Sequence, residues 1–219
     1  MSILPYCVTL RSSASAPLRG IGGSEVLVLA EGSLNAYYSL LPDTEKLGDV
    51  EDLKRAALDF HSVITDILCA TATLPLSFPT LLPEVEDLRH SLRERHAEFV
   101  RQLEAMGDAV QMEIRFSHAP SQDVQASGTD YLRQKAARAR QFHAADELCR
   151  RELDSLVREW RSRESGEDVK LVAKVGRGTV EDFRRRVADI ALPPGVNGRV
   201  SGPWPAMEFV ELAEPCPRL

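Results

Sequence analysis

The chain has 219 residues, of which 43% are hydrophobic and 27% charged, and its formal net charge at pH 7 is −6. This composition is typical of a folded globular protein and excludes a disordered or fibrous chain. The acidic balance disfavours a protein dedicated to nucleic acid or to an anionic membrane.

The N-terminal residues predict strands followed by a helix. Residues 3–10 are rich in strand formers, and residues 24–42 read as two apolar strands joined at Glu31-Gly32-Ser33, which predicts a hairpin. A helix follows to about residue 72, with apolar residues at three- and four-residue spacing and Asp49 as its N-cap.

Two further elements precede a polar segment. Residues 73–82 predict an extended segment, and a single helix is expected from Pro83 to Gly107, with Gly107 suited to its C-terminal end. Residues 109–116 alternate as a strand does. The small, polar residues of 117–128 then indicate a boundary between a domain of residues 1–117 and a domain of residues 118–219.

The second half predicts a long helix and a small sheet. The helix is expected from Tyr131 to about Arg163, roughly 50 Å at 1.5 Å per residue. Residues 168–175 predict a strand, and Thr179 with Asp182 predicts a capping box at the start of a short helix. Each half therefore combines strands with helices, which indicates an α+β fold.

The C-terminal motif Gly202-Pro203-Trp204-Pro205 predicts a turn between two strands. The prolines donate no backbone hydrogen bond, and Gly202 permits a close backbone approach. We expect Trp204 to fill the core of the second domain, with Met207 and Phe209 on one face of the following strand. The alternative is that Trp204 anchors a partner.

No catalytic, cofactor or metal site is expected. The cysteines Cys7, Cys69, Cys149 and Cys216 are scattered, which favours reduced thiols in the cytoplasm. Among the histidines, His90 and His96 lie six residues apart, which is not a metal-ligand spacing on one helical face. No Gly-x-Ser-x-Gly motif is present, and His61 reads as a core-lining or hydrogen-bonded residue.

Two glycine-rich stretches are candidate anion sites. Residues 20–23, Gly-Ile-Gly-Gly, precede no helix and read as a loop. Gly176-Arg177-Gly178 lies between a strand and a helix and offers backbone N–H groups to an anion. The Lys-Ser/Thr pair of a phosphate loop is absent, however, so a plain strand-to-helix turn is the simpler interpretation.

The segment predicted as a long helix is basic within an acidic chain. Residues 131–163 carry nine Lys/Arg against five Asp/Glu. Such a face either steers an anionic partner or is merely solvated. The candidate partner-binding residues are Arg133, Arg138, Arg140, Arg150 and Arg151.

Taken in order, five motifs resemble the gas vesicle protein GvpF/GvpL family. They are YCVTL…GIGGSEVLVLAEGSLNAYYSLLP (6–10 and 20–42), HSVITDILCATATLPLSFPTLL (61–82), GTDYL (128–132), LVAKVGRGTVEDFRRRV (171–187) and VSGPWPAMEFV (200–210). The last is the most specific. The sequence departs from the family pattern where Ser77, Pro79, Ala206 and Met207 replace Arg, Gly, Pro and Tyr.

The resemblance implies two α+β domains, the first a variation on the ferredoxin-like fold and the second a long helix with a ferredoxin-related unit. It implies no enzymatic activity and no cofactor. It further implies an accessory or minor structural protein of gas vesicles in the cytoplasm, in contact with the small hydrophobic shell protein GvpA and with other accessory proteins. The alternatives are an interaction scaffold outside gas vesicles and, more remotely, an anion- or nucleotide-binding enzyme using the Gly-Arg-Gly turn.

Overall fold

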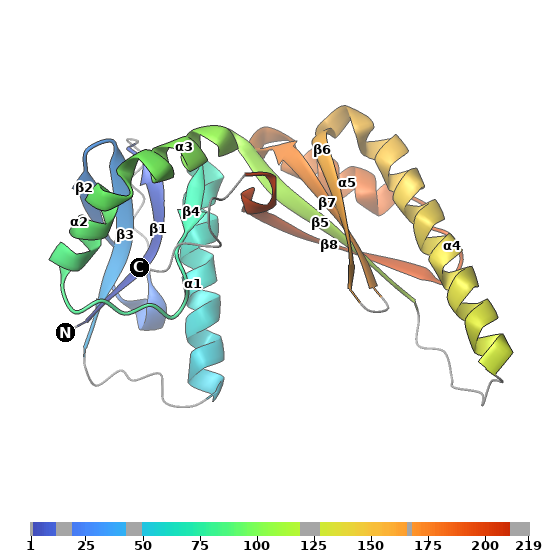
Figure 1. Cartoon of the computed structure of the whole chain (residues 1–219), viewed down its shortest axis with the longest axis horizontal. Coiled ribbons are helices and arrows are strands. Elements are labelled where there is room, and N and C mark those ends of the chain that lie inside the picture. The colour runs from blue at the N-terminus through green and yellow to red at the C-terminus, as the bar shows by residue number, and fades with distance from the viewer. Residues whose placement is uncertain (1, 12–18, 43–49, 119–127, 166–167, 211–219) are drawn as a thin grey trace. The chain divides into compact units, whose positions relative to one another are not determined.

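The protein contains two compact α+β units, each built on a four-stranded antiparallel sheet with helices (Figure 1). The structure is a computed structural model and describes residues 2–11, 19–42, 50–118, 128–165 and 168–210. Unit 1 comprises Met1–Ala109 and Trp204–Leu219, and unit 2 comprises Val110–Pro203. The chain therefore passes from one unit to the other twice.

The sheet of unit 1 has the strand order β2-β3-β1-β4. Its strands are β1 (Ser2–Leu10), β2 (Leu27–Glu31), β3 (Leu34–Leu41) and β4 (Thr73–Pro75). Strand β1 pairs with both β3 and β4 and is buried along all but its two end residues. A strand that is apolar on both faces requires cover on both faces of the sheet.

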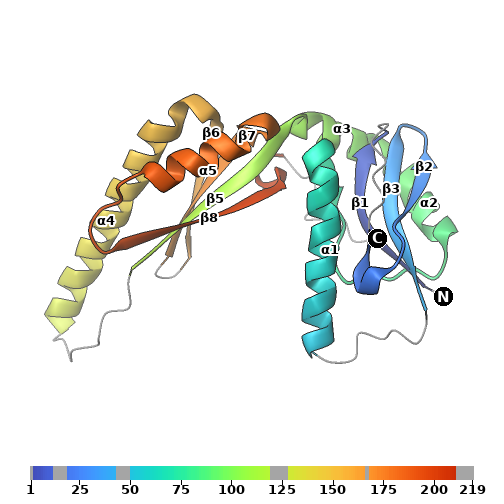
Figure 2. The same cartoon turned by 180° about the vertical axis from the view of Figure 1, so that it is seen from behind.

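Helices supply that cover in unit 1. Helix α1 (Val50–Ala70) lies against one face, whereas α2 (Val85–Glu94) and α3 (His96–Met106) lie against the other (Figures 1 and 2). On the α1 side the core includes Leu4, Tyr6, Tyr37, Leu41, Phe60, Val63, Ile64 and Ile67. The predicted strands, hairpin and first helix are confirmed, while Asp49 lies outside the described residues.

The helix predicted over 83–107 is wrong as a single element. The chain leaves the helical conformation at Arg95, where φ is −105° and ψ is 15°, and α3 starts anew at His96. No glycine or proline marks this break. The guanidinium of Arg95 instead forms two 2.9 Å hydrogen bonds to Glu98 and lies over the ring of Phe99.

The extended segment predicted over 73–82 is only partly a strand. Strand β4 ends at Pro75, and the chain pairs with the sheet again at Leu82. There the backbone N–H of Leu82 donates to the carbonyl of Ile3 at 3.0 Å, and the reciprocal bond is 2.9 Å.

Unit 2 follows the β-α-β-β-α-β order of ferredoxin-like domains. Its elements are β5 (Ala109–His118), α4 (Gly128–Leu153), β6 (Val157–Ser165), β7 (Asp168–Gly176), α5 (Val180–Asp189) and β8 (Val196–Pro205). The strand order is β6-β7-β5-β8, which is the order that unit 1 has in its own four strands. Unit 1 differs because no α-helix links β1 to β2 in the part of the chain that the structure describes.

Strand β5 belongs to the sheet of unit 2, between β7 and β8. The sequence places the domain boundary at 117–118, whereas the compact units divide after Ala109. The polar segment that suggests a linker follows the first strand of unit 2. It is the connection from β5 to α4 within one unit.

The long helix ends earlier than its sequence predicts. Helix α4 stops at Leu153, a 3₁₀ turn covers Asp154–Leu156, and residues 157–165 form β6. Strand β6 pairs with β7 from Val157↔Val175 to Ser165↔Asp168. Long-range pairing therefore overrides the helix propensity of a segment rich in Arg and Glu.

The C-terminal motif also differs from its prediction. Strand β8 continues through Pro205, and a 3₁₀ turn over Met207–Phe209 replaces the predicted second strand. Gly202 has φ of 110°, a backbone conformation that favours glycine. Trp204 groups with unit 1, so it does not fill the core of the second unit.

Candidate interaction surfaces

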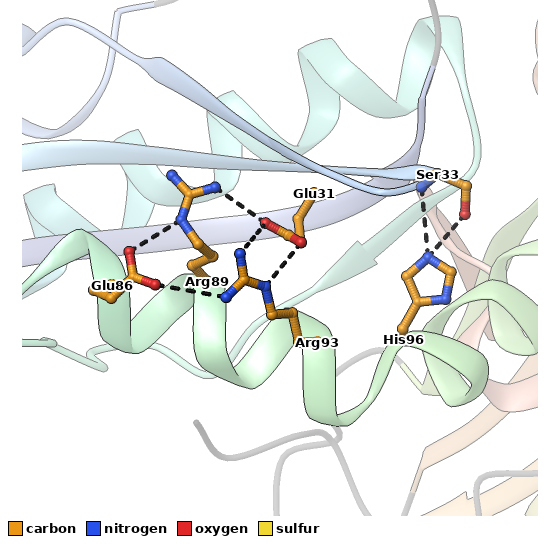
Figure 3. A network of polar contacts seen from close by, with 6 residues as sticks. All are labelled: Glu31, Ser33, Glu86, Arg89, Arg93 and His96. Atoms are coloured by element: carbon orange, nitrogen blue, oxygen red, sulfur yellow. Dashed lines mark hydrogen bonds and ion pairs between the residues drawn. The ribbon is translucent and has the colours of Figure 1, made fainter.

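A polar network holds the tip of the β2–β3 hairpin against helices α2 and α3. It comprises Glu31, Ser33, Glu86, Arg89, Arg93 and His96, and we call it the hairpin clamp (Figure 3). The hairpin supplies Glu31 and Ser33, and the two helices supply the other four residues.

Glu31 is the centre of the hairpin clamp. One carboxylate oxygen accepts a 2.9 Å hydrogen bond from Nε of Arg93, and the other accepts a 3.0 Å bond from Nη1 of Arg89. Glu86 accepts a 3.1 Å bond from Nε of Arg89 and so orients that side chain. Bonds from Arg93 and then Arg89 hold the pKa of the Glu31 carboxyl below its ordinary value.

His96 holds the turn itself. Its Nε2 lies 3.0 Å from Oγ of Ser33 and accepts a 3.5 Å hydrogen bond from the backbone N–H of Ser33. The same nitrogen lies 3.0 Å from where a Cβ on Gly32 would stand, and Gly32 has φ of 58°. The turn therefore requires glycine both for its backbone conformation and for the close approach of His96.

The hairpin clamp is absent from the sequence prediction. Its ion pairs join residues 58 and 62 positions apart. The available signal was the spacing of Glu86, Arg89 and Arg93, which places them on one side of a helix. Glu31, the carboxylate that Arg89 and Arg93 share, stands out in the sequence only as an acidic residue at a predicted turn.

Trp204 packs on α1, within unit 1. Its ring centroid lies 4.6 Å from that of His61, with the planes tilted by 38°. Both side chains are half-buried. Burial lowers the pKa of His61 from its ordinary value. His61 is thus a packed, partly core-lining residue, in line with the simpler reading of its sequence.

The structure divides the five candidate arginines between two halves of α4. Arg133, Arg138 and Arg140 lie in the N-terminal half, where almost every described side chain is exposed. Arg150 and Arg151 lie in the last turn, where the helix packs on its unit through Phe142, Ala145, Cys149 and Leu153.

Arg150 is engaged within unit 2. It donates a 2.8 Å hydrogen bond to Asp146 and a 2.7 Å bond to Oγ of Ser162, and its guanidinium lies 5.4 Å from the ring centre of Trp160. Arg151 is exposed and bonds its neighbour Glu152. These contacts make Arg150 a residue that joins α4 to β6.

The Gly-Arg-Gly stretch is a tight connection from β7 to α5. Oγ1 of Thr179 donates a 2.8 Å hydrogen bond to the carbonyl of Gly176, so the predicted capping box with Asp182 does not form. Asp182 instead pairs with Arg185, and Glu181 also lies in the first turn. Two carboxylates at this helix end disfavour an anion there.

The described residues contain no group of three or more His, Cys, Asp or Glu side chains arranged to hold a metal ion. Cys7 and Cys149 are buried free thiols, and Cys69 is exposed. Burial raises the pKa of Cys149 to about 11, and it raises that of Cys7 further. Neither buried thiol has the lowered pKa of a nucleophile.

Of the helices in the described ranges, none combines the length and apolar character that crossing a membrane requires.

Comparisons with known proteins agree with this architecture. The chain matches the family described as gas vesicle synthesis protein GvpL/GvpF over residues 3–211. It is 29% identical to gas vesicle protein L of Streptomyces sp. (strain CB03234) over 247 aligned positions, which cover 95% of this chain and 92% of the relative. It is 27% identical to gas vesicle protein F of the same organism over 54% of this chain and 49% of that protein.

Two solved structures have the same fold. The crystal structure of GvpF from Anabaena sp. PCC7120 superposes with a TM-score of 0.74 at 12% identity and covers 97% of both chains. GvpF from Microcystis aeruginosa gives 0.71 at 12% identity, covering 96% of this chain and 99% of that one. Because the family match spans nearly the whole chain, the protein belongs to the gas vesicle synthesis protein GvpL/GvpF family.

Proposed function

We propose that this protein is a non-enzymatic accessory or minor structural protein of gas vesicles, which binds the small hydrophobic shell protein GvpA and other accessory proteins during assembly. The observation that carries the proposal is the family match over residues 3–211. A shell subunit with apolar surface aggregates before assembly unless a partner covers it. That task requires binding surface and no catalytic group.

Several features of the described residues support a binding role. Burial raises the pKa of both buried thiols, which disfavours the reactive thiolate. The helix after the Gly-Arg-Gly turn carries Glu181 and Asp182 in its first turn, and their charge disfavours an anion there. Strand β2 lies at one edge of the sheet of unit 1, and its residue Val28 is 51% exposed. Edge strands with exposed apolar residues are suited to contact with other proteins.

The test is co-purification in the native host, where the protein carries an affinity tag and the shell protein is detected by mass spectrometry. We expect the shell protein in the eluate and defective vesicles in a deletion strain. Normal vesicles after deletion, with no shell protein retained, would contradict the proposal. A different retained protein together with normal vesicles would favour the scaffold alternative.

A further inference from the structure

The N-terminal half of α4, residues 129–141, has no buried side chain where the structure describes one. From Leu132 to Arg140 every side chain is exposed except that of Arg138, which is half-buried, and Leu132 is 65% exposed. The packed stripe begins only at Phe142. Figures 1 and 2 both show this half, drawn in yellow, reaching past the strands of its own sheet. A helix exposed all round lacks the packing that stabilises most helices.

One side of this half carries an apolar seam. Leu132, Ala136 and Ala139 follow one another at spacings of four and three, so they share a face of the helix. This alternation is the spacing of residues that pack between paired helices. Small side chains at the contact allow a second helix to approach closely.

Basic side chains flank the seam. Arg133, Lys135 and Arg140 each stand next to a seam residue, and the sequence has no Asp or Glu from 131 to 145. Charges flanking a helix seam select the partner helix. A second copy of α4 laid on this seam would place like charges opposite one another, which is unfavourable.

We propose that this surface docks an amphipathic helix with acidic flanks from another gas vesicle protein, an inference that rests on the proposed function. We call it the α4 seam and define it as Leu132, Arg133, Lys135, Ala136, Ala139 and Arg140. Carboxylates of the partner lie opposite the three basic residues, and its apolar residues cover the seam. A nucleic acid does not need an apolar seam, and one leucine with two alanines offers a lipid surface little apolar area to bury. The net charge of −6 also repels extended polyanions.

The test uses the full-length chain and a synthetic three-heptad peptide with Leu at its seam positions and Glu at its flanking positions. A peptide with Lys in place of Glu is the matched probe. Affinities are measured by fluorescence anisotropy at low and at physiological salt. We expect the Glu peptide to bind, the Lys peptide not to bind, and affinity to fall as salt screens the flanking charges.

Two variants locate the binding. Charge reversal in R133E/K135E/R140E should weaken binding of the Glu peptide by at least about tenfold. The variant K54E/R55E/R101E changes the net charge equally on exposed positions of unit 1 and should bind as the wild type does. Ala139→Trp leaves the charge unchanged but obstructs the seam, so it should also weaken binding. Circular dichroism confirms that each variant keeps its helix content.

Several results would overturn the inference. These are equal binding of both peptides, unchanged affinity in R133E/K135E/R140E or Ala139→Trp, and equal affinity for phosphatidylserine vesicles or duplex DNA. Any of them combined with retained co-purification of the shell protein would remove the α4 seam and leave the proposed function standing. Loss of shell-protein association with intact peptide binding would do the reverse.

Discussion

Glu31 receives hydrogen bonds from two arginines of one helix, so a single carboxylate ties the hairpin to α2. Its side chain is only 19% exposed, whereas that of Arg93 is 57% exposed. Isolated ion pairs on a surface contribute little because water competes for both partners. The sheltered position of Glu31, shared by two donors that Glu86 helps to orient, makes the clamp stronger than an isolated pair.

Glu31→Gln should loosen the hairpin at neutral pH. The lowered pKa of Glu31 means that its ionised form stabilises the fold above the ordinary value of 4.5, and that this stabilisation is lost as pH falls through the folded-state pKa. Amide hydrogens of β2 and β3 should therefore exchange faster in the variant at pH 7, and this difference from the wild type should shrink as pH falls below 4.5 through the lowered pKa of Glu31. Glu94→Gln removes an exposed carboxylate of helix α2, the helix that carries Arg89 and Arg93, and is the control. Equal exchange in the wild type and Glu31→Gln at pH 7 would show that the clamp contributes nothing.

Trp204 shelters His61, and its removal should be seen in the titration of that histidine. The wild-type midpoint should lie below the ordinary value of 6.5, and Trp204→Ala should raise it toward 6.5, as followed by NMR. Because the folded-state pKa is the lower one, unit 1 loses stability as pH falls through 6.5 toward that pKa, and the variant should lose less. Trp160→Ala, in unit 2, is the control.

The same variant also has a cost in stability. Trp204 is half-buried, so we expect a loss of about 1–3 kcal/mol, below the 3–5 kcal/mol typical of a fully buried tryptophan. The loss should appear in the unfolding of unit 1. An unchanged His61 titration in Trp204→Ala would mean that α1 and its other neighbours bury the imidazole without the indole.

At the scale of elements, the two halves of α4 should respond differently to the same substitution. Ala145 is fully buried and Ala137 is exposed. Glycine costs about 1 kcal/mol of helix propensity, and a buried methyl group contributes roughly 0.8 kcal/mol more. Ala145→Gly should thus lower the free energy of unfolding of unit 2 by about 2 kcal/mol, whereas Ala137→Gly, which loses no buried methyl group, should lower it by about 1 kcal/mol or less.

Urea denaturation followed by Trp160 fluorescence in a Trp204→Phe background measures both values. Trp160 lies in β6 of the same unit and reports its unfolding. A loss in Ala137→Gly as large as that in Ala145→Gly would indicate that the N-terminal half of α4 is stabilised by contacts of its own. The α4 seam would then be occupied within the chain.

Elements with local signals were predictable from the sequence, and those set by long-range contacts were not. The hairpin at Gly32 and helix α1 carry their signals in neighbouring residues, and both are confirmed. Strand β6 depends on β7, and the break at Arg95 depends on side-chain contacts of a charged residue that suits a helix interior. The hairpin clamp was not predicted for the same reason, since an ion pair between residues 62 positions apart leaves no local pattern in the sequence. The basic character of the exposed half of α4 is visible in the sequence, whereas its apolar seam can be identified only once the exposure of each side chain is known.

At the scale of the whole molecule, charge is divided unequally between the units. Unit 1 carries 10 Lys/Arg against 19 Asp/Glu, whereas unit 2 carries 17 against 14. The net charge of −6 therefore combines an acidic unit with a mildly basic one. Opposite local fields suit a protein that meets partners of different charge through different parts of its surface.

The division of the chain predicts which fragments fold. Unit 2 is one continuous segment with a complete β-α-β-β-α-β order, whereas unit 1 is built from two segments. A fragment of residues 109–205 contains all of β5 and β8 and should fold alone, with a dispersed NMR spectrum and a cooperative thermal transition.

A fragment of residues 118–219 follows the boundary that the polar segment suggests, and it loses β5. Because β5 lies between β7 and β8, its removal leaves β8 without a neighbouring strand. It also removes the buried side chains of Met112, Ile114 and Phe116 and so exposes the core residues that they cover. That fragment should aggregate or show no cooperative unfolding, and its folding as well as 109–205 would contradict the assignment of β5 to unit 2 as a folding unit.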